Sequence, residues 1–485
     1  MRVLVQTLFL LIIGLVISGQ AEAQVAALDS PAVDHYKLAT TIDPEKHWLS
    51  GQAEITLRNS TPHPITSVSA LLYRLMEISA ATDSSGRSLR FTQAIIRFPD
   101  NPTWQVNAVQ VFLPTALDSG KTATVHLNHG GYLFGYREVM LYVRETISAD
   151  YSLLRAETMP FPMIGSPSYA SWRSAVQNKF AYETEVTVPA GYLAPCIGEQ
   201  VAEPQTKDGK TTFRCAGEPA SNALNIAVAK FHVLDDSARK LRVYATPEDQ
   251  AAADRVMSDM RRALDFFTSY FGPPPKIGTM GAHSGLTVIE IPEGWGSYAL
   301  GGYIFQSAAA FKDPKNAGEL YHEVGHVWNA MIADRVQRTR YFDEAFASYF
   351  EALAVRQFEG EQAYRELLDS YRDTFLNRLN REPLGKTTAI ADYGKNEIGV
   401  FSYTKGAWSL YVLHELVGDD KFKQIIRAFL SEFGDRPADF KDFQRVAERV
   451  SQRDLGRFFD EWIFGVASTQ LLSGKTPVAE IVKRY

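Results

Sequence analysis

The sequence predicts a multidomain protein in which an all-β N-terminal domain precedes a mixed, mostly helical domain. From about residue 34 to residue 233, short runs alternate apolar and polar residues between clusters of Gly, Pro, Asn and Asp. That pattern is typical of strands and turns. From about residue 244, apolar residues recur every three or four positions, as on one face of a helix. We therefore expect a β-sandwich followed by a largely helical α+β domain.

The size and charge of the chain support this division and exclude one class of partner. The chain has 485 residues, of which 45% are hydrophobic, so two or three domains can each bury a core. Its formal net charge is −6. Lys and Arg are scattered, without the basic stripe that nucleic-acid binding needs. We expect no nucleic-acid partner, and nothing in the composition predicts an oligomeric state.

The first 23 residues are typical of a signal peptide. Arg2 precedes an apolar stretch at residues 8–17, and Ala-Glu-Ala at residues 21–23 forms an A-x-A-like cleavage site. The alternative is an uncleaved anchor, for which the stretch is short. No later segment has the roughly 20 uninterrupted apolar residues of a transmembrane helix. We therefore expect an exported protein, periplasmic or secreted, with no membrane span after the signal is removed.

Residues 24–240 are assigned to the β-sandwich. One representative alternating run covers residues 122–127. His126 and His129 lie in or just after this run, where a solvated strand face and a turn explain them better than a metal site does.

The only two cysteines, Cys196 and Cys215, flank a turn-like stretch with Asp-Gly at residues 208–209. Asp-Gly favours a hairpin, which would bring the two arms close together. In an oxidising compartment a disulfide follows. The alternative is a pair of inert thiols, since no histidine is placed beside either cysteine.

Residues 241–485 are assigned to the second domain. Thr246 and Pro247 are suited to the start of a helix, and Gly272 to its end. Prolines and glycines then surround the apolar runs 286–291 and 303–305, which predicts a small sheet. After these runs, helices dominate to about residue 464.

The run His-Glu-Val-Gly-His at residues 322–326 is the strongest functional signal. On a helix, positions i and i+4 lie on one face, so His322 and His326 can reach one metal ion. Glu323 then lies beside the open coordination position. The pattern predicts a zinc site that can hydrolyse a substrate.

The surroundings of this run favour a helix. Asp313 with Pro314 makes a suitable start, and the helix is expected to cover residues 315–332. Gly325 in its interior costs about 1 kcal/mol relative to Ala. That cost is more easily understood if another element packs closely against the same turn.

A catalytic zinc ion usually has three protein ligands, so a third is needed. Glu344 is the best candidate, because it comes early in the helical stretch 342–351, whose aromatic residues would bury one face. Glu344 could instead be a first-turn residue favoured by the helix dipole. Two His and one Glu in a tetrahedral site favour a single zinc ion over cobalt or manganese.

These residues resemble the aminopeptidase N family of gluzincin zinc peptidases. The family has its ligand glutamate within Asn-Glu-Gly-Phe-Ala-Ser-Tyr, and residues 343–349 here read Asp-Glu-Ala-Phe-Ala-Ser-Tyr. Seventeen residues separate His326 from Glu344, against the family's usual 18. The resemblance implies a thermolysin-like catalytic domain at residues 241–485, and a compact member, since only about 20 residues follow Trp462.

A second match concerns the oxyanion. Residues 401–407 read Phe-Ser-Tyr-Thr-Lys-Gly-Ala and resemble the family's Tyr-x-Lys-Gly-Ala segment, which implies that Tyr403 donates a hydrogen bond to the tetrahedral intermediate. Such a donor is worth roughly 2.7 to 4 kcal/mol. The alternative is an ordinary packed tyrosine. Glu323 would act as general base and later as proton donor to the leaving amine.

The family anchors the substrate's α-amine with the glutamate of a Gly-x-Met-Glu-Asn strand. Here residues 296–300 read Gly-Ser-Tyr-Ala-Leu, so Ala299 stands at the glutamate position. We take Gly296, Ser297, Tyr298 and Ala299 as the corresponding substrate-binding segment.

Two other acidic residues are candidates for the missing anion. Glu293 and Glu157 could each supply it from a different position, or each could be an ordinary surface glutamate. Trp295, Tyr298 and Tyr303 could line an aromatic cleft, or serve as core residues.

Three functions follow from these observations, all with a peptide or protein as the partner. The first is an exported zinc aminopeptidase with an unusual amine anchor. The second is a zinc peptidase of the same fold without strict recognition of a free amine. The third is a protein-binding module that retains zinc without turnover, which the intact Glu323 and Tyr403 argue against.

Overall fold

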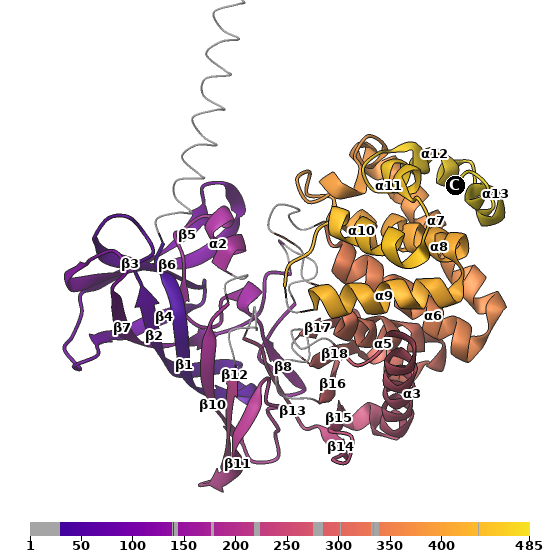
Figure 1. Cartoon of the computed structure of the whole chain (residues 1–485). Helices are drawn as coiled ribbons and strands as arrows, with labels where there is room; N and C mark the ends of the chain where they lie inside the picture. Colours follow the sequence, from indigo (N-terminus) through magenta and orange to yellow (C-terminus); the bar gives the residue numbers. More distant parts are fainter. Residues whose placement is uncertain are drawn as a thin grey trace, which may run out of the picture. The chain divides into compact units, whose positions relative to one another are not determined.

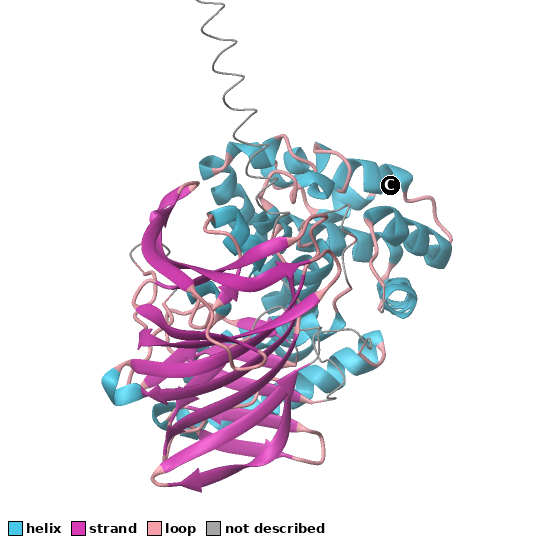
Figure 2. Ribbon diagram, turned by 90° about the vertical axis from the view of Figure 1, so that its left-hand side faces the viewer, coloured by secondary structure: helices cyan, strands magenta, loops and turns pink. Residues whose placement is uncertain are grey.

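The computed structural model describes residues 30–137, 139, 144–175, 179–217, 224–274, 285–300, 302–330, 333, 339–434 and 436–485. The expected signal peptide lies outside this part of the chain. The chain divides into two compact units, the first ending at Phe231 and the second running from His232 to Tyr485 (Figure 1). Strands dominate the first unit and helices the second (Figure 2). Within the described ranges, no helix is long and apolar enough to cross a membrane.

The larger sheet of the first unit has seven strands in the order β11-β12-β10-β1-β2-β7-β4. Strands β1 and β10 pair in parallel, and the other neighbours pair antiparallel. The strands are β1 (Ala32–Asp43), β2 (Trp48–Arg58), β4 (Met76–Asp83), β7 (Thr122–Tyr132), β10 (Ala181–Pro189), β11 (Glu199–Lys207) and β12 (Lys210–Gly217).

A four-stranded sheet in the order β5-β6-β3-β9 supplies the second layer. Leu38 and Ile55 from the larger sheet belong to the same buried cluster as Leu71 and Val109 from the smaller one, which confirms the predicted sandwich. The remaining elements are β3 (Ile65–Tyr73), β5 (Phe91–Phe98), β6 (Asn101–Leu117), β9 (Met163–Ile164), α2 (Tyr169–Ala175), and the separate pair β8 (Tyr151–Leu154) and β13 (Ile226–Ala229).

The expectation for His129 is wrong in one respect. His129 is not in a solvated turn: β7 continues to Tyr132, and His129 lies on the same inward face as Val125 and Leu127. Its side chain is buried, and burial lowers its pKa to about 4. Gly130 and Gly131, which follow His129, lie inside β7 and do not end it.

The predicted hairpin and disulfide are both confirmed. Strands β11 and β12 pair antiparallel around Asp208 and Gly209, which both have positive φ, as a tight hairpin turn requires. Cys196 and Cys215 are bonded, with their Cα atoms 5.5 Å apart.

The second unit contains a five-stranded sheet in the order β14-β15-β16-β18-β17. The predicted runs are present as β16 (Leu286–Ile291) and β18 (Tyr303–Ser307). The expected domain division at residue 240 falls inside the hairpin of β14 and β15, because the sheet of this unit begins at His232. The other strands are β14 (His232–Asp236), β15 (Leu241–Ala245) and β17 (Tyr298–Leu300).

Helices make up the rest of this unit. The predicted first helix exists, although a short 3-10 helix, Pro247–Ala252, precedes it and Thr246 makes no side-chain cap. The α-helices are α3 (Ala253–Phe271), α4 (Ala308–Lys312), α5 (Ala317–Gly325), α6 (Phe346–Glu359), α7 (Glu361–Arg381), α8 (Lys405–Val417), α9 (Asp419–Phe433), α10 (Phe440–Ser451), α11 (Gly456–Trp462), α12 (Ala467–Ser473) and α13 (Val478–Val482).

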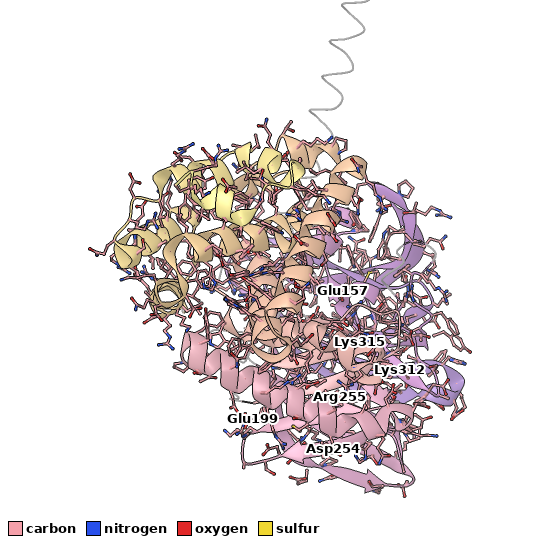
Figure 3. The ribbon with its side chains drawn as sticks, turned by 90° about the vertical axis from the view of Figure 1, so that its right-hand side faces the viewer. Glu157, Glu199, Asp254, Arg255, Lys312 and Lys315 are labelled. Carbon is pink, nitrogen blue, oxygen red and sulfur yellow. A yellow bond between two sulfur atoms is a disulfide. The ribbon has the colours of Figure 1, made fainter. Side chains whose placement is uncertain are left out.

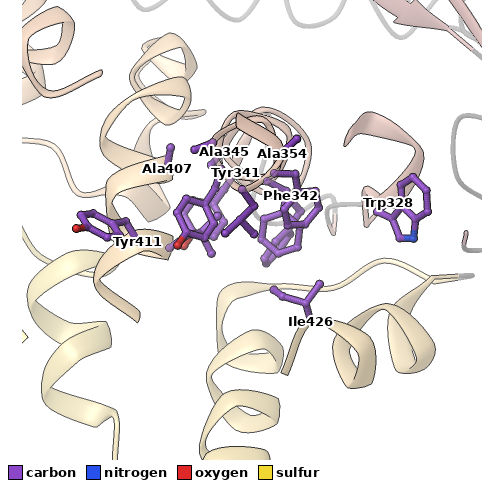
Figure 4. Packing of buried hydrophobic residues seen from close by; sticks show 14 of the residues in the cluster. Trp328, Tyr341, Phe342, Ala345, Ala354, Ala407, Tyr411 and Ile426 are labelled. Atoms are coloured by element: carbon purple, nitrogen blue, oxygen red, sulfur yellow. The ribbon is translucent and has the colours of Figure 1, made fainter. Parts of the chain in front are cut away.

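The aromatic core of this unit packs α5 and α6 together. Figure 4 shows Trp328, Tyr341 and Phe342 among its buried side chains. A Cβ atom added to Gly325 would lie 3.4 Å from both Ala347 Cα and Phe350 Cβ. The close approach predicted for Gly325 is therefore the contact between α5 and α6.

A buried lysine joins the start of α8 to α12. The Lys405 side chain is fully buried, and its Nζ donates a hydrogen bond to Thr469 Oγ1 at 3.1 Å. Burial away from water lowers its pKa from 10.5 to about 7, since a buried ammonium is costly.

This burial makes stability depend on pH in a defined direction. Between pH 7 and 10.5 the unfolded chain binds more protons at this residue, so the free energy of unfolding rises with pH by up to about 1.4 kcal/mol per unit. We expect Lys405→Met to raise the free energy of unfolding at pH 7 and to reduce this slope. Urea denaturation at pH 7 and pH 9 measures the free energy of unfolding of each variant. Lys386→Met, at an exposed lysine, is the control. Identical pH profiles for wild type and Lys405→Met would contradict it.

Candidate active site

The two histidines lie at the end of α5. The α-helix ends at Gly325 and continues as one 3-10 turn from His326 to Trp328, so it is shorter than the expected 315–332. The structure describes residues 329 and 330 as non-helical. The rings of His322 and His326 nevertheless lie on one side, with their centroids 4.9 Å apart.

Glu344 reaches these histidines from a π-helical turn, Tyr341–Ala345, that precedes α6. The sequence predicted an ordinary helix here. The wider turn leaves Glu344 buried, with 4% of its surface exposed, and turns its carboxylate toward α5. Such turns are common at functional sites.

Three ligand atoms converge. Glu344 Oε2 lies 3.2 Å from His322 Nε2 and 3.4 Å from His326 Nε2, and the three residues form a set that could hold a metal ion. Ligand atoms bound at 2.0–2.2 Å to a tetrahedral zinc lie roughly 3.3–3.6 Å from one another. The residues present therefore fit a zinc ion in both type and spacing.

Each histidine is oriented through its second ring nitrogen. His322 Nδ1 lies 3.4 Å from Glu351 Oε2, which also accepts a 2.7 Å hydrogen bond from Tyr371. His326 Nδ1 lies 2.8 Å from the Asn329 amide nitrogen. The Glu351 carboxylate can accept a hydrogen bond from Nδ1, which fixes the His322 tautomer that presents Nε2 to a metal.

The Asn329 amide carries further information. Among the described residues its Oδ1 is buried without a hydrogen-bond partner. A histidine that binds a metal through Nε2 has its proton on Nδ1 and needs an acceptor there. Turning the amide over, a choice that coordinates alone do not fix, brings Oδ1 to His326 and satisfies both groups.

Glu351 and Asn329 were not identified from the sequence. For Glu351 there was a signal: it follows Glu344 by seven residues, two helical turns, and so lies on the same face. Asn329 had no comparable signal, because it lies beyond the end of the helix.

Glu323 has the environment of a general base. It is 5% exposed, and its Oε2 lies 4.0 Å from His326 Nε2 and has no hydrogen-bond partner in the described part of the chain. Burial raises its pKa, while the nearby histidines oppose this shift. The free carboxylate oxygen can accept a proton from water beside the metal.

Tyr403 lies where a hydrogen-bond donor is needed. Its ring is parallel to that of His322, with centroids 6.0 Å apart and an interplanar angle of 4°. Burial, together with the charge of Glu344, raises its pKa well above the usual value. The phenol therefore keeps its proton and can donate it in a hydrogen bond.

The predicted substrate-binding segment forms the edge of the five-stranded sheet. Ala299 lies in β17 and pairs with Ile304 of β18, and the Tyr298 ring stacks on Phe305 at 4.6 Å. Gly296 has open space where a Cβ would lie. The segment is thus a half-buried strand at the end of the sheet order, without a carboxylate at position 299.

Ser297 has a structural role beside this edge. Its Oγ accepts hydrogen bonds from Gln306 Nε2 at 3.0 Å and from the Ser307 amide at 2.9 Å, and donates one to Glu319 of α5. The bond to Glu319 ties the strand segment to the helix that carries the histidines.

The two alternative anions have other surroundings. Glu293 is largely exposed and pairs with Lys312 at 2.9 Å; Lys312 is labelled in Figure 3. Glu157 belongs to the first unit, in the turn Ala156–Thr158, with its Oε2 3.9 Å from Arg155 Nε. Glu293 thus has the ion pair of an ordinary exposed glutamate, whereas Glu157 Oε2 is buried and has no hydrogen-bond partner among the described residues.

Comparison with known proteins points to one family. Residues 305–462 match the peptidase family M1 domain. Human glutamyl aminopeptidase is 24% identical over 345 residues, covering 66% of this chain and 34% of that protein. The chain thus spans about a third of the length of this relative.

Solved structures show the same fold. An M1 zinc metallopeptidase from Deinococcus radiodurans covers 89% of this chain and 93% of its own, with a TM-score of 0.59 and 19% identity. A mutant of that protein was solved with a Tyr-Ser-Ala substrate, with a TM-score of 0.57 and 18% identity, covering 90% of this chain and 94% of its own. Residues 305–462, which match this domain, include the three converging ligands, Glu323 and Tyr403, and the chain shares the fold of an M1 zinc metallopeptidase.

Proposed function

We propose that this protein is an exported zinc aminopeptidase that recognises the substrate's amine differently from its relatives. One observation carries the proposal: His322, His326 and Glu344 converge with zinc spacing, beside a glutamate with a free oxygen and a protonated tyrosine. This arrangement has the parts that peptide hydrolysis needs.

The residues divide the reaction among themselves. His322, His326 and Glu344 would hold the zinc, which polarises a carbonyl and lowers the pKa of water toward about 7. Glu323 takes the proton of the attacking water and passes it to the leaving amine. Tyr403 donates a hydrogen bond to the oxygen that becomes negative.

The edge strand β17 supports a peptide as substrate. An edge strand has unpaired backbone groups, with which an extended peptide can form main-chain hydrogen bonds. This edge packs near α5 through Ser297 and Glu319, so a peptide aligned on it would pass the metal ligands. One relative is the human protein named glutamyl aminopeptidase, and that name supports an exo-acting role.

Export has separate support. The disulfide between Cys196 and Cys215 is the kind of bond that persists in oxidising compartments and is rare in the cytosol. Together with the signal-like N-terminus, it favours a periplasmic or secreted protein.

Glu323→Gln isolates the general base. We expect the variant to bind zinc as the wild type does and to lose roughly 100- to 10,000-fold in kcat, because Gln cannot accept the proton. Peptide hydrolysis and zinc content should be measured on the same preparations. The exposed Glu366→Gln is the control, and should behave as wild type. A fully active Glu323→Gln enzyme would overturn the assignment.

A second function is favoured by Ala299. Because no carboxylate stands at that position, the enzyme could cut internally or accept blocked peptides instead of anchoring a free amine.

One pair of substrates separates the two functions. The zinc-loaded protein is incubated with a fluorogenic aminoacyl substrate that has a free amine and with an N-acetylated, internally quenched peptide, each with and without chelator. We expect cleavage of the free amine alone, abolished by the chelator. Cleavage of both establishes the second function, and cleavage of neither favours the binding module and contradicts the proposal.

A further inference from the structure

Arg340 lies at the metal centre without being one of its ligands. One guanidinium nitrogen donates a hydrogen bond to Glu344 Oε1, and Nε lies 3.4 Å from Asp343 Oδ2. The same guanidinium lies over the Tyr403 ring, 5.5 Å from its centroid. A single side chain thus contacts both a metal ligand and the oxyanion donor. Resting on the proposed function, we propose that Arg340 is a positioning residue for the metal centre.

The first part of its action concerns Glu344. The two oxygens of the carboxylate have different partners. Oε1 accepts a hydrogen bond from Arg340, and Oε2 faces both histidines. With Oε1 occupied, Glu344 would have only Oε2 available for a metal ion. A metal held by two nitrogens and one oxygen keeps the fourth tetrahedral position open for water.

The second part concerns Tyr403. Its ring has the His322 imidazole parallel to it and the Arg340 guanidinium over it. These contacts restrict the ring's rotation, which fixes the direction in which the phenol donates. Arg340 therefore couples the orientation of Tyr403 to that of Glu344.

The backbone supports a dedicated position. Arg340 has φ of 56°, a left-handed conformation that costs free energy for a residue with a side chain. Its carbonyl oxygen accepts hydrogen bonds from the backbone amides of Glu344 and Ala345, at 3.1 and 3.2 Å. Arg340 thus starts the π-turn that carries Glu344, and its side chain returns to the carboxylate of the same turn.

Arginine suits these contacts better than lysine. Its planar fork can direct separate N–H groups to Glu344 and Asp343 while its face covers the ring of Tyr403. A lysine ammonium keeps the charge but not this geometry. Arg340→Lys therefore removes the geometry and keeps the charge, whereas Arg340→Met removes both.

The test measures zinc affinity by competition with a chromophoric chelator for the wild type, Arg340→Met, Arg340→Lys and a control, Arg356→Met. Arg356 is a matched control, because its side chain is similarly exposed and forms an ion pair with Glu361, with Nε 2.7 Å from Oε2. This ion pair does not involve the metal ligands. We expect Arg340→Met to bind zinc 10- to 100-fold more weakly, the usual effect of losing a partner of a metal ligand. Arg340→Lys should remain severalfold weaker, and Arg356→Met should match the wild type.

The kinetic readout tests the coupling to Tyr403. At saturating zinc, Arg340→Met should lower kcat about tenfold or more with KM nearly unchanged, since the lost orientation acts in the transition state. The proposal would be overturned if Arg340→Met bound zinc as tightly as the wild type. It would also be overturned if the variant bound zinc more tightly, as simple repulsion between the arginine and the zinc ion predicts. So would an unchanged kcat. If the wild type cleaves no peptide, the proposed function fails, while the zinc affinities still decide the role of Arg340.

Discussion

The close packing of α5 on α6 at Gly325 determines where the metal ligands lie. His322 and His326 come from α5 and its final turn, and Glu344 from the turn that begins α6, so the distance between the two helices sets the distance between the ligands. A Cβ atom at residue 325 would already be in van der Waals contact with Ala347 and Phe350, so no room is left between the helices for a larger side chain. The aromatic core around Trp328 and Phe342 holds the two helices in this contact.

The electrostatics of the centre follow from burial. Glu323, Glu344 and His326 are buried and His322 is only 13% exposed, so unpaired charge is costly in this region. Glu344 satisfies this constraint through the histidines and Arg340, and His322 through Glu351. Glu323 keeps one carboxylate oxygen unpartnered among the described residues. A group left unsatisfied in so dry a place is the one expected to exchange a proton during the reaction.

Much of this centre could be predicted from the sequence, because helical periodicity is a local property. The spacing of His322 and His326 predicted the metal site, and the aromatic face after Glu344 predicted the third ligand. The alternation of apolar and polar residues predicted the sandwich. The π-turn, the early end of α5 at Gly325 and the roles of Arg340 and Asn329 could not be predicted. Each depends on contacts between segments, which the order of residues in one helix does not reveal. The prediction for His129 was wrong for a related reason, since the length of β7 is fixed by its pairing with β2 and β4.

The central claim is that His322, His326 and Glu344 together hold one zinc ion, and elemental analysis of the purified protein tests it most directly. After incubation with zinc and removal of the excess by gel filtration, the wild type should retain one zinc per chain, and Glu344→Ala should retain almost none while remaining folded by circular dichroism. A wild type that retains no zinc, or a Glu344→Ala variant that retains a full equivalent, would contradict the account.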